Sequence, residues 1–181
     1  MIAYLARFRV SLGFMFGLVV LWLARPTMWT LALGVPVAVA GESLRVWAAG
    51  HLNKSREVTA SGPYRWLAHP LYAGSSMMGA GLAIAAGSVS VALLIVAYLT
   101  ATLAAAIKSE EAFLRRTFGD QYDRYRRGRT APGVDTQRRF AFAQARANHE
   151  QRAIAGLAAA VLLLVLKATY NSAFWRAAAG P

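Results

Sequence analysis

Long apolar stretches, each near the length of a membrane-spanning helix, dominate the sequence. A spanning helix needs roughly 20 mostly apolar residues. Five stretches approach that length: residues 8–24, 27–49, 70–87, 89–107 and 153–168. Pro70 suits the first turn of its helix, where a backbone N–H is not needed. The pattern predicts an all-α, polytopic transmembrane bundle of about five spans, forming a single membrane-embedded domain over residues 1–181.

Basic residues are distributed unevenly between the predicted loops. If the N-terminus is placed inside, most of the 20 lysine and arginine residues fall on the inner side, and Arg25, Lys167 and Arg176 fall outside. Inner loops of membrane proteins carry such an excess. The bias predicts a cytoplasmic N-terminus and a short cytoplasmic cap built from residues 51–69 and 108–152. Arginine outnumbers lysine and alanine is abundant, a composition typical of bacteria, which indicates the inner membrane.

The end of the first apolar stretch bears on whether that stretch is retained. A secretory signal peptide ends in a small-residue A-x-A cleavage site. This chain instead reads Leu23-Ala24-Arg25-Pro26 and enters the next apolar stretch at once. We therefore expect an uncleaved helical hairpin.

Composition excludes several kinds of site. The chain has no cysteine, which excludes disulfides, thiolate metal sites and a cysteine nucleophile. Its three histidines are far apart in sequence and none has metal-ligand spacing, so we expect no metal site. The net charge of +12 fits membrane topology and attraction to anionic lipid headgroups. It does not indicate nucleic-acid binding, because the basic stretch lacks the interleaved aromatic residues of a stacking platform.

One polar constellation stands out from the apolar background. It consists of residues 62–74, which include His69, and the acidic pair Glu110-Glu111. Two apolar runs joined by a short turn at Gly87 separate the two parts. A chain that runs up one helix and down the next returns to its starting level, so His69 and the glutamates should meet at one membrane face. Polar groups held at a membrane edge are costly unless they bind something, so this is the best candidate site.

The motifs around that constellation resemble the integral-membrane methyltransferases of the isoprenylcysteine carboxyl methyltransferase and phospholipid methyltransferase type. The resemblance covers about residues 45–125. It rests on Gly62-Pro63-Tyr64, His69-Pro70-Leu71-Tyr72-Ala73-Gly74, Gly79-Ala80-Gly81, Glu110-Glu111-Ala112-Phe113-Leu114 and Phe118-Gly119-Asp120-Gln121-Tyr122-Asp123-Arg124-Tyr125. It implies S-adenosylmethionine as methyl donor, bound at the cytoplasmic helix ends, and a lipophilic acceptor that enters from the bilayer.

The resemblance also suggests roles for individual residues. The donor's ammonium or ribose hydroxyls suit Glu110 and Glu111, and its carboxylate suits free N–H groups near Leu71 at the start of a helix. Prenylcysteine methyltransferases have an arginine where this chain has Ala68; Arg65, one turn earlier, is the candidate to replace it. The predicted catalytic residues are Arg65, His69 and Glu111. The predicted donor-binding residues are His69, Leu71, Tyr72, Gly74, Gly79, Gly81, Glu110 and Glu111, with helix packing as the alternative role of Gly79 and Gly81.

Glu42 and Arg45 form a second point of interest within the second apolar stretch. They lie three residues apart and so share one helix face. Charges inside a span face a cavity or each other. We predict that they line the acceptor pocket together with Tyr64; the alternative is a structural ion pair.

Two other functions remain open from the sequence. One is a membrane reductase that shares the helical core, and the other is a non-catalytic membrane scaffold or accessory protein, which the missing arginine at position 68 favours. The N-, O- or S-methyl acceptor is also open. Small-residue faces suit packing within one chain or between chains.

Overall fold

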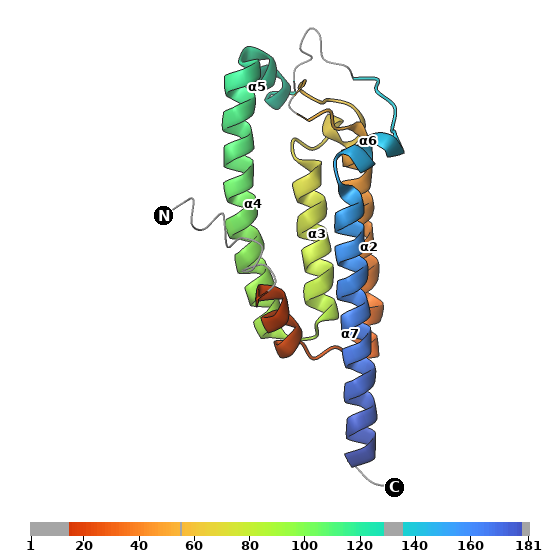
Figure 1. Cartoon of the computed structure of the whole chain (residues 1–181). Helices are drawn as coiled ribbons and strands as arrows, with labels where there is room; N and C mark the ends of the chain where they lie inside the picture. Colours follow the sequence, from red (N-terminus) through yellow and green to blue (C-terminus); the bar gives the residue numbers. More distant parts are fainter. Residues whose placement is uncertain (1–14, 55, 129–135, 179–181) are drawn as a thin grey trace.

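The computed structural model describes residues 15–54, 56–128 and 136–178, and over these residues the fold is helical, with no strand. This confirms the predicted all-α class. Residues 15–23 form a helix that precedes the labelled ones. The labelled elements are α2 (Met28–His51), the 3-10 helix η1 (Gly62–Arg65), α3 (Pro70–Ala85), α4 (Val89–Phe118), α5 (Asp120–Arg126), α6 (Phe142–Ala147) and α7 (Glu150–Ala178). They form an elongated bundle with the short helices α5 and α6 at one end (Figure 1).

Three of these helices are long and apolar enough to cross a membrane: α2, α4 and α7. The predicted third span is α3, which has only 16 residues, slightly short for a bilayer of average thickness. Residues 8–14 of the predicted first span lie outside the described residues. The count of five spans and their orientation therefore stay predictions.

The largest interface in the bundle lies between α2 and α3. Glycines face each other across it: a Cβ on Gly41 would lie 2.7 Å from the Gly74 carbonyl oxygen, and a Cβ on Gly74 would lie 2.7 Å from the Gly41 carbonyl oxygen. One heptad further along, Gly34 and Gly81 leave no room for a Cβ either. Small residues allow two helix backbones to approach this closely in a membrane. The two helices therefore form a close-packed pair.

The helix α4 has a different relation to α3. It starts after the Gly87 turn, where the Ser88 hydroxyl accepts from the Val91 N–H, and runs for 30 residues to Gly119. Its contacts with α3 include Leu99 against Gly79, about a third of the way along. Towards the end that carries α5, α3 and α4 separate in Figure 1. The last turns of α4 thus extend past its apolar part and carry Glu110 and Glu111.

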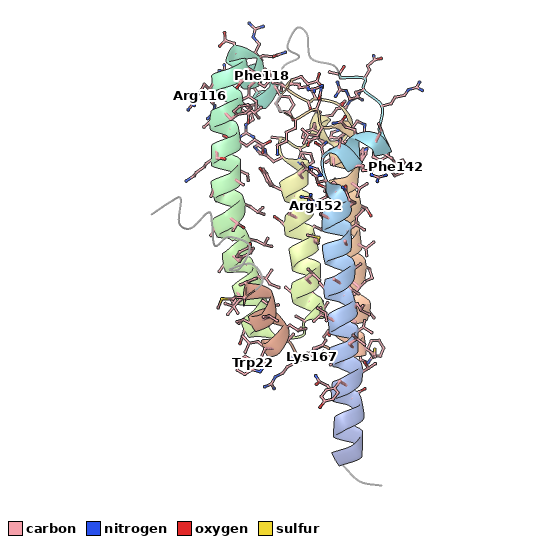
Figure 2. The ribbon with its side chains drawn as sticks, in the orientation of Figure 1. Trp22, Arg116, Phe118, Phe142, Arg152 and Lys167 are labelled. Atoms are coloured by element: carbon pink, nitrogen blue, oxygen red, sulfur yellow. The ribbon has the colours of Figure 1, made fainter. Side chains whose placement is uncertain are left out.

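The helix α7 packs along α2 and is held at two levels by polar contacts. Near its first turn, the Glu150 carboxylate accepts two 3.0 Å bonds from Arg45 of α2. Further along, past the middle of the helix, the Lys167 ammonium donates to the carbonyls of Leu21 and Trp22, the latter at 2.8 Å. Figure 2 shows Lys167 and Trp22 at the end of the bundle opposite Arg116 and Phe118. The buried apolar core lies mainly near this second end: Ala24, Leu31, Ala85, Ala86, Val91, Ile95, Leu164 and Ala168.

The segment around α6 closes the C-terminal end of α2. The last carbonyls of a helix have no partner within the helix. Here Asn148 donates to the carbonyls of Ala49 and Leu52 at 2.8 and 2.9 Å, and Gln144 donates to the Leu52 carbonyl at 2.8 Å. The Ala141 N–H donates to the Gly50 carbonyl at 3.2 Å. These bonds fix the point at which the chain leaves α2 for the loop that borders the candidate site.

Candidate active site

A cavity of about 380 Å³ lies at the α5 end of the bundle. Its walls come from the loop after α2, from η1, from the first turn of α3, from the last turns of α4 and from α5. Its volume is in the range of small-molecule binding pockets. The lining residues are Leu52, Lys54, Glu57, Val58, Thr59, Tyr64, Ala68, Leu71, Tyr72, Ala106, Ser109, Glu110, Phe113, Leu114, Tyr122 and Tyr125.

The start of α3 forms one polar edge of this cavity. His69 precedes the helix and Pro70 occupies its first turn. The N–H groups of Tyr72 and Ala73 both donate to the His69 carbonyl at 3.1 Å, whereas the described residues offer no acceptor to the Leu71 N–H. Tyr72 of α3 and Glu110 of α4 both line the cavity. The two helices of the hairpin therefore meet through polar groups at the cavity, as the sequence predicted from their spacing.

Beside the cavity, Glu111 is the centre of a charged cluster. Its carboxylate lies 3.1 Å from His69 Nε2, 3.1 Å from the Arg126 guanidinium and 3.5 Å from that of Arg115. A neighbouring ion pair at 3.4 Å joins Arg115 to Asp123 of α5. The cluster thus ties α3, α4 and α5 together and orients the His69 ring.

The helix α5 lies over the cavity. A glycine with positive φ flanks it on each side in the chain: Gly119, at 48°, before the helix and Gly128, at 69°, after it. The Tyr125 hydroxyl donates to the Tyr64 carbonyl at 2.8 Å, and burial raises the pKa of Tyr125 to about 12, so the phenol stays a donor at neutral pH. Tyr122 is 1% exposed, and its hydroxyl has no hydrogen-bond partner within the described part of the chain.

The structure brings part of the predicted donor site together. Leu71, Tyr72 and Glu110 line the cavity, and so does Tyr64, which was predicted to contact the acceptor. His69 and Glu111 lie at its edge, bonded to each other.

Other predicted site residues lie elsewhere. The Arg65 guanidinium donates to the Thr136 carbonyl and does not line the cavity. Gly74 and Gly81 lie in the α2–α3 interface, and Gly79 lies under Leu99. These placements favour helix packing as the role of the three glycines; their contact with a donor stays a prediction.

The Glu42–Arg45 pair belongs to a different part of the molecule. Arg45 Nε lies 3.4 Å from the Glu42 carboxylate, and its other nitrogens contact Glu150 and Ser75. Glu42 lines a separate apolar groove of about 880 Å³ between α2 and α7. The structure therefore contains the ion pair that was the alternative to acceptor binding, and neither residue borders the smaller cavity.

Several lining residues were not predicted as site residues. Lys54, Glu57, Val58, Thr59 and Phe113 gave no sequence signal beyond turn chemistry and helical spacing. Tyr122 and Tyr125 carried a signal, since their spacing placed both on one helix face, but their position over the cavity depends on the turn at Gly119. Within the described residues, no group of three histidine, aspartate or glutamate side chains lies close enough to hold a metal ion.

The sequence of this chain is similar to those of known proteins. The family model described as phospholipid methyltransferase matches residues 8–121. The nickel-cobalt-cadmium resistance protein NccN of Alcaligenes xylosoxydans xylosoxydans is 31% identical over 108 residues, covering 59% of this chain and 49% of that protein. The protein-S-isoprenylcysteine O-methyltransferase of Schizosaccharomyces pombe is 32% identical over 88 residues, covering 49% of this chain and 37% of that protein. The match thus spans half or less of each relative's length. No solved structure matches the chain.

Proposed function

Because the chain belongs to the phospholipid methyltransferase family, we propose that it is an integral membrane enzyme that transfers a methyl group from S-adenosylmethionine to a lipophilic acceptor in the bilayer. The observation that carries the proposal is the cavity of about 380 Å³ that Tyr72 and Glu110 line from the two helices of one hairpin. It lies at the end of α4 that carries Glu110 and Glu111, beyond the apolar part of that helix.

The residues of the cavity fit the chemical groups of the donor. When bound, S-adenosylmethionine supplies an electrophilic methyl group on a cationic sulfonium and leaves as a neutral thioether after in-line displacement. Glu110 offers a carboxylate to the donor's ammonium or ribose hydroxyls. The Leu71 N–H offers a donor to its carboxylate. The apolar remainder of the lining, including Leu114 and Ala106, excludes water around the reacting groups.

His69 is the residue best suited to handle a proton. Its Nε2 lies 3.1 Å from the Glu111 carboxylate, which favours the proton on Nε2 and leaves Nδ1 as an acceptor. An acceptor amine or thiol loses a proton as it is methylated, and His69, next in the chain to Ala68 of the cavity lining, is the candidate to take it. Arg65 is not placed for this step, because its guanidinium bonds the Thr136 carbonyl.

The route of the acceptor and the side of the membrane are part of the same proposal. The cavity reaches α4 at Ala106 and Ser109, close to the part where α3 and α4 separate (Figure 1). A lipid-borne amine, thiol or carboxyl group would enter from the bilayer between these helices. The surplus of basic residues at this end supports a cytoplasmic active site in a bacterial inner membrane.

The test is calorimetric binding of S-adenosylmethionine and S-adenosylhomocysteine to the detergent-purified protein. We expect micromolar binding to the wild type and a loss of about tenfold or more in Glu110→Gln, because a charge-assisted hydrogen bond contributes about 1.5–3 kcal/mol. Asp120→Asn is the matched control, since Asp120 is an exposed carboxylate at the same end that does not line the cavity. A folded wild-type protein that binds neither compound would refute the proposal.

A further inference from the structure

Tyr122 is buried without a partner for its hydroxyl. The side chain is 1% exposed, and no hydrogen bond to its hydroxyl oxygen is formed by the residues that the structure describes. A buried polar group left unpaired costs about 1–3 kcal/mol, and most such groups in native proteins have a partner. Tyr122 also lines the cavity of the proposed donor site. The missing partner is therefore expected to be a ligand in that cavity.

The neighbouring polar side chains are already engaged. Glu111 holds His69 and Arg126, and the Tyr125 hydroxyl donates to the Tyr64 carbonyl. Burial raises the pKa of Tyr122 further above its ordinary value, so its hydroxyl is neutral and able to donate at neutral pH. The hydroxyl is thus available to an acceptor atom on a ligand.

The surroundings of Tyr122 indicate which part of a ligand lies there. Four further aromatic rings line the same cavity: Tyr64, Tyr72, Phe113 and Tyr125, the last with its centroid 6.3 Å from that of Tyr122. Aromatic rings stack on the planar faces of nucleic-acid bases. Adenine combines such a face with ring nitrogens that accept hydrogen bonds, whereas the amino-acid half of the donor has no planar ring.

We propose that the aromatic end of the cavity holds the adenine of the methyl donor and that the Tyr122 hydroxyl donates a hydrogen bond to one of its ring nitrogens. This inference rests on the proposed function. It makes Tyr122 a donor-binding residue carried by α5, the helix whose ends are the positive-φ glycines Gly119 and Gly128.

The variant Tyr122→Phe removes only the hydroxyl and leaves the ring. Without ligand, we expect its thermal stability to equal or exceed that of the wild type, because an unpaired buried hydroxyl is replaced by an apolar edge. Calorimetric affinity for S-adenosylhomocysteine and for adenosine should fall by the same factor, about three- to tenfold. If Tyr122 had only a structural role, removing its hydroxyl would not raise the stability of the protein and lower its affinity at the same time. Unchanged affinity, or lower stability without ligand, would overturn the inference.

Two comparisons distinguish a failure of this inference from a failure of the proposed function. Tyr125→Phe is the matched control: its hydroxyl has a partner at 2.8 Å, so we expect this variant to lose stability without ligand. If the folded wild type binds no S-adenosylhomocysteine, the proposed function fails. If it binds and Tyr122→Phe binds equally well, only the role of Tyr122 fails. Competition by methionine but not by adenosine would refute the position of adenine.

Discussion

At the scale of single residues, Glu111 connects more of the candidate site than any neighbour described above. One carboxylate contacts a histidine that begins α3, an arginine one turn along α4 and an arginine at the end of α5. Only 16% of its side chain is exposed, so these contacts are less screened than surface ion pairs. The sequence placed Glu111 near His69, and Arg115 lies one helical turn away on the same helix, whereas the contact with Arg126 depends on the turn at Gly119.

We expect Glu111→Gln to lower the stability of the protein by about 1–3 kcal/mol, because it removes charge-assisted hydrogen bonds and leaves three donors around a neutral amide. The measurement is thermal unfolding in detergent without ligand. Asp123→Asn is the control: its carboxylate is 40% exposed and contacts Arg115 alone among the described ion pairs, so its effect should stay below about 1 kcal/mol. Equal effects of the two changes would contradict a central role for Glu111.

At the scale of elements, α2 and α3 form the rigid part of the bundle. Their glycines place backbone against backbone, so any added side-chain atom must push the helices apart. In contrast, a Cβ on Gly156 of α7 would meet nothing within 4 Å. These two kinds of glycine look alike in the sequence, since both interrupt apolar helices.

The contrast yields a matched pair of substitutions. Gly41→Ala should destabilise the protein by about 1–3 kcal/mol, because the new Cβ overlaps the α3 backbone. Gly156→Ala should be neutral or stabilise by up to about 1 kcal/mol, because alanine is the better helix former and the site is open. Thermal unfolding of both variants in one detergent checks this. A loss of stability in Gly156→Ala equal to that in Gly41→Ala would show that packing does not set the difference.

The same elements show what a pattern of apolar residues predicts. It predicted the spans that correspond to α2, α4 and α7, and α4 continues beyond the predicted residues 89–107 to Phe118. It did not find the contacts made by residues 136–150. Arg45 pairs with Glu150, 105 residues away, and Phe140 packs on Gly50. Contacts of this kind depend on how α7 packs on α2, which no local periodicity encodes.

At the scale of the whole molecule, polar function and apolar packing occupy opposite ends. The cavity and the Glu111 cluster lie at the α5 end, and the main apolar core lies near Ala24 and Ala86. The sequence predicted the polar end, from the basic loops and from the hairpin between His69 and Glu110, but not the position of the core. Neither feature defined the cavity itself, because its walls come from five separate segments.

The absence of cysteine makes the membrane orientation directly testable. Single cysteines at Arg124 of α5 and Met28 of α2 lie at opposite ends of the bundle, and both positions are exposed. The test uses bacterial cells whose outer membrane is permeable to the reagent and whose inner membrane is intact. A thiol reagent that cannot cross the inner membrane should label Met28→Cys and leave Arg124→Cys unlabelled. Lysis should make both react. Labelling of Arg124→Cys in intact cells would reverse the proposed orientation.

The looser packing of α4 has a consequence for the bilayer. The α2–α3 pair is held by backbone contact, whereas α4 separates from α3 towards the cavity, and both contribute walls to it. A change in the tilt of α4 would change the width of the cavity, and the hydrophobic thickness of the bilayer acts on the tilt of a spanning helix. The lipid composition of the bilayer would then affect the width of the cavity, in addition to supplying the proposed acceptor.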